Sequence, residues 1–320
     1  MTDVSLGVVP PSRTPLKVFG VLGILLGVLC LGFAALLLVM VSYSHNLPNG
    51  QDLPIRTQVP GVLVFTFMGF LFAALGWGTF MARRWARTLS LIVGWSWLIT
   101  GVISTGVMAF MVPKMLNPPE GSPLGPSGRL AVVVFTFLVL AVIYIVLPVV
   151  GLVFYHLPKT QRAFEAFHPE RDWTDQCPPS VLTVVLLHVL FVVGMVAALP
   201  FFNFMDPFFG VVLFGWKGFL ALALQGALFL YLARGLYRLE RKAWFLSVWA
   251  NGLWALSGLI TFWNKDLVSI QDMLGIAAPP MTGIDAVRLF SPMGMTVWSL
   301  VFWAAWLGYL LWIGRHFKRD

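Results

Sequence analysis

The sequence predicts an all-α integral membrane protein with eight transmembrane helices, and two observations lead to this fold class. Of the 320 residues, 59% are hydrophobic and only 11% are charged, whereas about a quarter of the residues of a soluble domain are charged. Apolar runs of about 20 residues, the length that a helix needs to cross about 30 Å of hydrocarbon, recur along the chain. We therefore expect the bilayer to be the solvent of most of the chain and no soluble domain to be present.

The helices are expected, in chain order, over residues 17–42, 61–82, 86–111, 130–156, 181–200, 218–238, 243–263 and 293–314. Charged residues, clusters of Pro and Gly, or both, separate each run from the next. The first run follows Arg13 and Lys17 as a signal peptide would. It is longer than the apolar region of such a peptide and no A-x-A cleavage site follows it. We therefore expect the first helix to be retained.

The basic residues follow the positive-inside pattern of short cytoplasmic loops. With both termini in the cytoplasm, fifteen of the 21 Lys and Arg residues lie inside and the remaining six lie outside. The six are Arg56, Lys114, Arg129, Lys217, Lys265 and Arg288. This bias predicts an N-in, C-in topology and insertion in the inner cell membrane. The net charge of +8 is thereby assigned to orientation in the membrane, and we expect no nucleic-acid partner.

An internal repeat is the most specific signal in the sequence. A shift of 157 positions aligns residues 67–103 with residues 224–260 without a gap. Both segments contain the motif W-x-x-[ST]-G, and we expect these motifs to lie at the interface between the repeats: Trp97, Thr100 and Gly101 in the first copy, and Trp254, Ser257 and Gly258 in the second. The other matched residues are Gly69, Phe72, Gly78, Arg84, Ala86, Ser90 and Ile103, facing Gly226, Phe229, Gly235, Arg241, Ala243, Ser247 and Ile260.

Four helices return the chain to the side from which it started, so the two copies are predicted to have the same orientation in the membrane. Residues 1–157 form the first four-helix repeat, residues 158–180 a cytoplasmic linker, and residues 181–320 the second repeat. In the linker we expect Phe164, Phe167 and Trp173 to be anchors at the headgroup surface. The Phe-rich segment around Asp206 and Pro207 aligns with polar residues of the first repeat, so we place it outside the membrane, in the headgroup layer or against a partner.

Three polar residues of the second repeat are the candidates for an intramembrane site. His188 and Asn251 both lie about 10–14 Å from the predicted cytoplasmic surface, and Gln225 lies about two turns further out. Ionisable groups at this depth are costly and tend to face protein or water. The alternative is that Gln225 and Asn251 form hydrogen bonds between helices and that His188 joins them.

Small residues are expected to let helices approach closely. Gly23 and Gly27 form a G-x-x-x-G motif in the first helix, and Gly101 and Gly258 are paired by the repeat. Cys30 is expected inside the first helix and Cys177 in the cytoplasmic linker, so the bilayer separates the two cysteines and both should be free thiols.

Signatures of common catalytic and nucleotide-binding sites do not occur: the sequence has no H-E-x-x-H, G-x-S-x-G, P-loop, C-x-x-C or EF-hand motif. The five histidines include only His188 deep in a predicted helix, which is too few for a bis-histidine haem. We therefore expect no cofactor and no metal.

Three functions from different classes remain. The first is a non-catalytic scaffold or accessory membrane component, whose partners are the lipid bilayer and a membrane protein or a second copy of the chain. The second is a carrier for a small molecule or ion, with a site near His188, Gln225 and Asn251. The third and least favoured is an enzyme that acts on lipid. Its only candidate catalytic residues are the linker acids Glu165, Glu170, Asp172 and Asp175.

Overall fold

The computed structural model describes residues 12–44, 55–116, 125–198, 203–263 and 292–317. Within these residues, eight helical spans are long and apolar enough to cross a membrane. They are Thr14–Met40, Val59–Phe80, Arg84–Gly106, Ser127–His156, Pro179–Ala197, Gly215–Tyr237, Arg241–Phe262 and Thr296–His316. All eight coincide with the predicted runs to within a few residues, and the chain is a multi-pass α-helical membrane protein.

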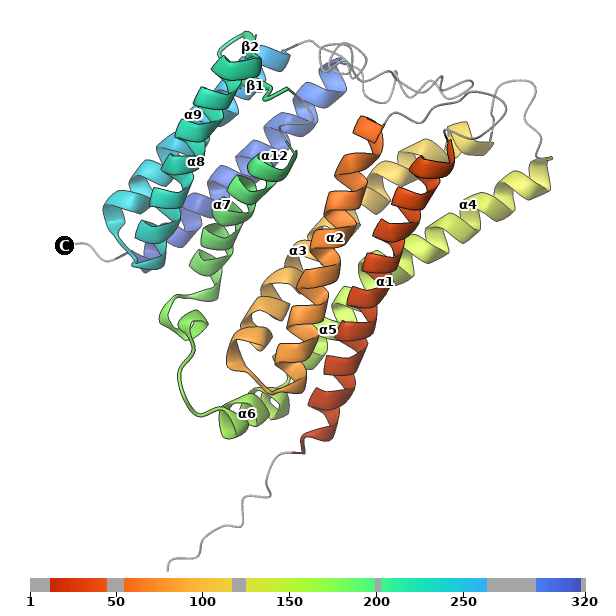
Figure 1. Ribbon diagram of the computed structural model, residues 1–320, viewed down its shortest axis with the longest axis vertical. Coiled ribbons are helices and arrows are strands. Elements are labelled where there is room, and N and C mark those ends of the chain that lie inside the picture. Colours follow the sequence, from red (N-terminus) through yellow and green to blue (C-terminus); the bar gives the residue numbers. More distant parts are fainter. Residues whose placement is uncertain (1–11, 45–54, 117–124, 199–202, 264–291, 318–320) are drawn as a thin grey trace, which may run out of the picture. The chain divides into compact units, whose positions relative to one another are not determined.

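The elements follow one another as Figure 1 labels them. The first three spans are α1 (Thr14–Ser44), α2 (Ile55–Phe80) and α3 (Arg84–Leu116), and the fourth is α4 (Pro126–Ala141), a π-helical turn η1 (Val142–Val146) and α5 (Leu147–His156). The linker contains α6 (Pro158–Phe167) and a 3-10 turn η2 (Trp173–Gln176). Then come α7 (Pro179–Ala198), β1 (Asp206–Phe208), β2 (Val211–Leu213), α8 (Gly215–Tyr237), α9 (Arg241–Phe262), α12 (Pro292–Ile313) and a 3-10 turn η4 (Gly314–His316).

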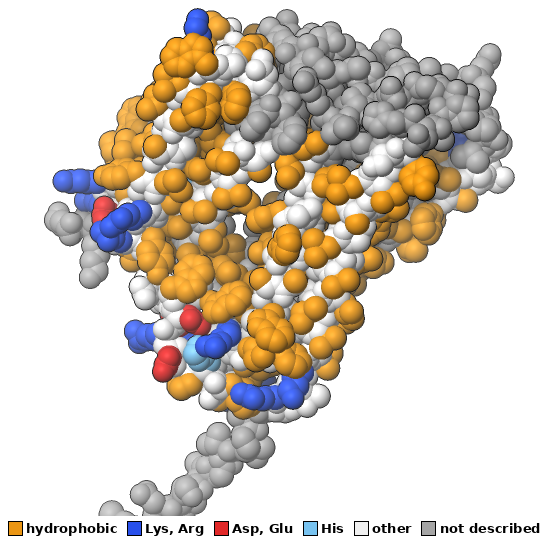
Figure 2. Space-filling view, in the orientation of Figure 1, with side chains coloured by type: hydrophobic (Ala, Val, Ile, Leu, Met, Phe, Trp, Pro, Cys, Tyr) orange, Lys and Arg blue, Asp and Glu red, His pale blue; other side chains and the backbone are white. Residues whose placement is uncertain are grey.

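Apolar side chains cover the sides of the helices. Figure 2 shows hydrophobic side chains along the helices and Lys, Arg, Asp and Glu side chains gathered near helix ends and turns. Large aliphatic side chains are exposed along the helices, including Leu25 (58% exposed) and Val196 (74%). In water such a surface would be strongly unfavourable, so these side chains are placed to face lipid.

The residues divide into two units, of which the first comprises residues 1–33, 65–106 and 137–176. In this unit α1 and α2 approach through glycine. A Cβ atom on Gly23 would lie 2.8 Å from the Cα of Gly76, and one on Gly27 would lie 2.7 Å from the backbone nitrogen of Ala73. The expectation that Gly23 and Gly27 allow close backbone approach is therefore confirmed, and close packing of this kind is how helices associate in lipid.

The π-helical turn η1 immediately precedes Pro148 in the fourth span. Proline has no N–H to donate to the carbonyl four residues earlier, and its ring crowds that position. The backbone widens here, and the amide of Leu147 donates to the carbonyl of Val142, five residues back. Gly101 of α3 lies against Tyr144 of this turn so closely that a Cβ atom would collide with the Tyr144 carbonyl.

The linker is folded against the first unit. Phe164 of α6 is 1% exposed and belongs to an apolar cluster with Leu16, Phe154 and Tyr155. The expectation that Phe164 anchors the linker at the headgroup surface is therefore wrong, because α6 is amphipathic and turns this ring into the protein. Trp173 is 43% exposed, and the guanidinium of Arg13 covers the ring of Phe167 at 4.2 Å.

The second unit comprises residues 34–64, 107–136 and 177–320. Its main part is a four-helix bundle of α7, α8, α9 and α12, which lie side by side in Figure 1. The antiparallel hairpin β1–β2 turns at Phe209 and Gly210, both with positive φ, and pairs Asp206 with Leu213. The hairpin packs on α9 and α8. The described part of the Phe-rich segment thus docks on the chain's own helices, and Phe201 and Phe202 lie outside the described residues.

Two short turns, one in each unit, have the same backbone geometry at positions 157 residues apart. Ala82 between α2 and α3 has a φ of 55°, and Leu239 between α8 and α9 has a φ of 59°. The amide of the next residue donates to a glycine carbonyl five residues back, from Arg83 to Gly78 at 2.8 Å and from Glu240 to Gly235 at 3.0 Å. Both turns are therefore helix ends of the Schellman type. In both, a Cβ atom on the glycine would collide with an alanine of the following helix.

Candidate functional site

The structure brings together two of the three residues of the predicted intramembrane cluster. His188 of α7 and Asn251 of α9 are both 3% exposed, and the imidazole Nε2 lies 3.4 Å from the Asn251 amide nitrogen. Gln225 of α8 does not join them and instead faces Asp206 of β1. Depth in the membrane was the basis for grouping the three residues, but contact also depends on the direction in which each helix turns its side chain.

Hydrogen bonds settle the roles of the His188 ring nitrogens. Nδ1 lies 2.7 Å from the carbonyl oxygen of Val184, one turn earlier, and so must carry the hydrogen that it donates. Nε2 is an acceptor, because the Asn251 amide nitrogen 3.4 Å away can only donate; the hydroxyl of Ser247 also lies 3.4 Å from it. The ring packs on Phe229, with centroids 4.9 Å apart. His188 is therefore placed as a neutral imidazole with both nitrogens engaged by protein.

Asn251 extends this network to a third helix. Its amide nitrogen donates to the carbonyl oxygen of Ser247 at 2.9 Å, and its amide oxygen accepts from the indole Nε1 of Trp306 at 3.0 Å. Three helices, α7, α9 and α12, are thus joined by one polar side chain. Chemically the arrangement can hold helices together in an apolar solvent. It presents no unengaged base or nucleophile.

The two W-x-x-[ST]-G motifs share one contact and differ in the others. Trp97 packs on Phe72 with ring centroids 5.0 Å apart, and Trp254 packs on the equivalent Phe229 at 6.0 Å. The hydroxyl of Thr100 returns to the carbonyl of Ser96 in its own helix at 2.9 Å. The role of the motifs between repeats stays a prediction.

The second motif has different polar and backbone contacts. The Ser257 hydroxyl donates to the carbonyl of Pro207 at 2.8 Å and accepts from the amide of Phe209 at 2.9 Å, so it holds the hairpin β1–β2. Gly101 lies against the turn η1, but a Cβ atom on Gly258 would meet nothing within 4 Å. The expectation of close backbone approach is wrong for Gly258, because no described neighbour lies close to the position of a Cβ atom on this residue.

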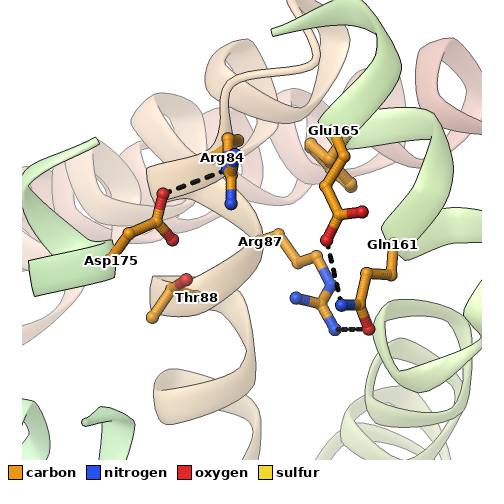
Figure 3. Close-up of a pocket in the computed structure, with 7 residues that line it drawn as sticks. Arg84, Arg87, Thr88, Gln161, Glu165 and Asp175 are labelled. Carbon is orange, nitrogen blue, oxygen red and sulfur yellow. Dashed lines mark hydrogen bonds and ion pairs between the residues drawn. The ribbon is translucent and has the colours of Figure 1, made fainter. Parts of the chain in front are cut away.

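A polar cleft that the sequence analysis missed lies in the first unit, where the linker meets the beginning of α3 (Figure 3). Arg84 forms an ion pair with Asp175 of η2, with 3.0 Å between Nε and Oδ2. The Arg87 guanidinium donates to the Tyr155 carbonyl at 3.1 Å and to the Gln161 side chain at 3.2 Å. Glu165 in turn accepts from Gln161 at 3.0 Å. The sequence contains one signal for this cleft: basic residues at the start of α3 that could pair with acidic residues of the linker.

Two acids of the linker, Asp172 and Asp175, serve the fold. Asp175 neutralises Arg84, and Asp172 accepts from the backbone amide of Trp85 at 3.2 Å in the first turn of α3. The first amides of a helix have no intrahelical partner, so Asp172 caps α3 from a distant part of the chain. The structure thus assigns these two of the four acids considered for lipid chemistry to structural contacts. No group of three or more His, Cys, Asp or Glu residues in the described part of the chain could hold a metal ion.

Replacing Asp172 with alanine is expected to lower the free energy of unfolding by about 1 kcal/mol, the usual cost of a lost helix cap. The amide of Trp85 loses its acceptor, and the linker loses a tie to α3. Chemical unfolding of the purified protein in detergent measures the effect. Glu170→Ala is the matched control, because Glu170 is an exposed acid of the same linker. An equal loss in both variants would contradict the capping role.

Both cysteines are free thiols, as expected. Cys177 precedes α7 and is 3% exposed, and burial raises the pKa of its thiol to about 11. The thiol is therefore protonated at neutral pH and is a poor nucleophile. This argues against a catalytic role for Cys177.

The chain matches no protein-family model, no curated protein sequence and no solved structure.

Proposed function

We propose that this protein is a non-catalytic scaffold or accessory component of a membrane, whose function is carried by its surfaces. The observation that supports the proposal is the closed hydrogen-bond network of His188, Asn251 and Trp306. His188 and Asn251 are buried at mid-helix, Trp306 is half-buried, and their polar groups satisfy one another, which is what a helix-joining element requires. The partners proposed are lipid together with a membrane protein or a second copy of the chain.

The proposed architecture is a parallel duplication with both termini in the cytoplasm of a cell whose inner membrane holds the protein. Its support from geometry is the pair of matching turns at Ala82 and Leu239 and the matching aromatic pairs of Trp97 with Phe72 and Trp254 with Phe229. Its support from sequence is the distribution of Lys and Arg between the two sides.

A carrier remains the alternative. It needs polar groups that are exposed to water in at least one state and that a solute can reach. The predicted site for it divides into two, since Gln225 is paired with Asp206 while His188 and Asn251 are joined to each other. A carrier that used His188 would have to break the hydrogen bonds of this network at each cycle.

The two functions predict opposite results for thiol accessibility at position 188. In a chain with Cys30 and Cys177 replaced by serine, His188→Cys is expected to resist a small membrane-impermeant thiol reagent in intact and in opened membranes. The side chain is 3% exposed and the contacts around it are protein. Labelling is measured by the mass of the modified chain.

The positive control is Tyr43→Cys in the same background, because Tyr43 is 69% exposed and lies beyond the first membrane span. It should react rapidly. Rapid labelling at position 188 would reveal an aqueous path to mid-membrane and overturn the scaffold proposal in favour of a carrier. A variant at the neighbouring Ser247, Ser247→Cys, gives the same readout if His188→Cys does not fold.

A further inference from the structure

The hairpin β1–β2 is fixed to α9 by three hydrogen bonds. Ser257 bonds to the carbonyl of Pro207 and to the amide of Phe209, and the hydroxyl of Thr261 accepts from the amide of Gly210 at 2.9 Å. Docking in this position carries Asp206, the first residue of β1, into the protein. The connection between two membrane spans thus delivers a carboxyl group to the bundle of the second unit.

The Asp206 side chain is completely buried, with 0% exposure. Both of its carboxyl oxygens face one group, the amide nitrogen of Gln225, at 3.0 and 2.9 Å. Gln225 lies ten residues after Gly215, which is about 15 Å along the helix axis from the beginning of α8. A buried carboxylate normally requires a cation or several donors.

Charged groups are absent from the immediate surroundings of Asp206 in the described residues. β2 contains only Val and Leu. The ionisable residues of α8 are Lys217 in its first turn and Tyr231, Arg234 and Tyr237 in its second half; those of α9 are Arg241 and Lys242 in its first turn. No ion pair joins any of them to Asp206 in this part of the chain.

The side-chain amide of Gln225 also lacks a hydrogen bond. Its side-chain oxygen is buried and has no hydrogen-bond partner among the residues that the structure describes. The oxygen and nitrogen of an amide are assigned from the network, and a rotation about the last side-chain bond exchanges their directions. A carboxylic acid and a primary amide can form a ring of two hydrogen bonds, in which the acid O–H donates to the amide oxygen and the amide N–H donates to the acid carbonyl. That ring would give the orphan oxygen a donor and would leave no charge buried.

We propose that Asp206 and Gln225 form a proton-binding site, in which Asp206 is a neutral carboxylic acid while the hairpin is docked. The Asp206 O–H donates to the Gln225 oxygen, and the Gln225 N–H donates to the other Asp206 oxygen. The proton comes from water: the carboxylate takes it from hydronium as the hairpin docks and returns it as the hairpin leaves. No oxidation or reduction takes part.

Proton binding makes hairpin docking depend on pH. Burial raises the pKa of Asp206, and the hydrogen bond from Gln225 lowers it by less. With the docked pKa above the undocked value of about 3.9, docking is fully favoured below that value. It weakens as pH rises toward the docked pKa, because the undocked state has then lost its proton and the docked state has not.

Hydrogen exchange of the hairpin tests the site in the full-length protein in detergent. The amides of Phe209 and Gly210 are bonded only while the hairpin is docked on Ser257 and Thr261, so peptides covering residues 203–214 report docking. The wild type is compared with Asp206→Asn at each pH, which cancels the intrinsic pH dependence of exchange. Asparagine has nearly the same shape as aspartic acid, and its amide can form a ring of two hydrogen bonds with the Gln225 amide without a titrating proton.

We expect protection of the wild-type hairpin, relative to Asp206→Asn, to fall by up to tenfold per pH unit between the two pKa values. A ratio that is independent of pH, or that rises with pH, would overturn the proposal, because the docked carboxyl would then have an ordinary or lowered pKa. Glu240→Gln, at an exposed acid of the same unit, should keep the wild-type slope.

A second measurement does not depend on the folding of the asparagine variant. The infrared spectrum of the wild type should contain the carbonyl band of a protonated carboxylic acid, which shifts in D₂O. As the pH is raised, this band should persist beyond the range in which solvent-exposed carboxyl groups ionise, and unfolding should abolish that persistence. Loss of the whole band within the range of exposed carboxyl groups would show an ordinary pKa for Asp206 and would also overturn the proposal.

Discussion

Gly76→Ala is expected to lower the free energy of unfolding by about 1–3 kcal/mol, the range for overpacking a tight contact. A Cβ atom at this position would lie 2.5 Å from the backbone nitrogen of Ile24 and 2.6 Å from the carbonyl oxygen of Gly20. Both obstacles are backbone atoms of α1, which cannot rotate away as a side chain can. The helices α1 and α2 must therefore move apart and lose contact over several turns.

Gly32→Ala is the matched control for this substitution. Gly32 also lies in a membrane-spanning helix, α1, but a Cβ atom there would meet nothing within 4 Å. The control should be neutral or gain up to about 1 kcal/mol from helix propensity. Thermal unfolding in detergent compares the two variants. If Gly76→Ala were as stable as Gly32→Ala, the close approach of α1 and α2 would be wrong.

Asn251→Ala is expected to cost about 2–4 kcal/mol, because it leaves the half-buried Trp306 indole N–H and the buried His188 Nε2 without their Asn251 partner. Each unsatisfied buried polar group costs about 1–3 kcal/mol. The removed side chain also leaves a cavity among α7, α9 and α12, which adds to the cost. Chemical unfolding in detergent, followed by the fluorescence of the tryptophans around the network, measures the loss.

Ser247→Ala separates the hydrogen bonds of the network from general sensitivity of this region. Ser247 is fully buried beside Asn251, but its hydroxyl makes only long contacts of 3.4 Å. Its backbone carbonyl, which accepts from Asn251 at 2.9 Å, is retained in the alanine variant. We therefore expect a loss below about 1 kcal/mol. Equal losses at positions 247 and 251 would mean that packing, and not the Asn251 amide, stabilises the site.

The proton-binding proposal and the scaffold proposal make independent claims. The first concerns a hairpin and one carboxyl group at the α8–α9 face, and the second concerns the network of His188, Asn251 and Trp306. A failed hydrogen-exchange test would leave the labelling prediction at position 188 unchanged. If both experiments give the expected results, the helix bundle excludes water around His188 and the hairpin responds to pH.

The sequence by itself determined the number, the order and nearly the ends of the membrane spans. An apolar run of about 20 residues has one stable solution in lipid, since a helix satisfies its own backbone hydrogen bonds and needs no partner to do so. The sequence also identified the glycines of α1 that admit α2, because small residues at a four-residue spacing act through the local helix geometry.

Tertiary structure decided which polar residues meet. Spacing along a helix gives the depth of His188, Gln225 and Asn251, but the direction of each side chain depends on which neighbours its helix packs against. The helices here are apolar on nearly every side, so no amphipathic stripe marks the buried face. Gln225 was therefore grouped with His188, although it faces a hairpin that joins two spans.

The contacts of the linker and of the hairpin also depend on the tertiary structure. Asp172 caps an amide 87 residues earlier in the chain, and Asp206 accepts from the side chain of Gln225, 19 residues later. Local sequence describes both segments as short connections with charged or aromatic residues. Only the folded chain supplies the distant donors that hold them, and for that reason the sites at these connections could be found from the tertiary structure alone.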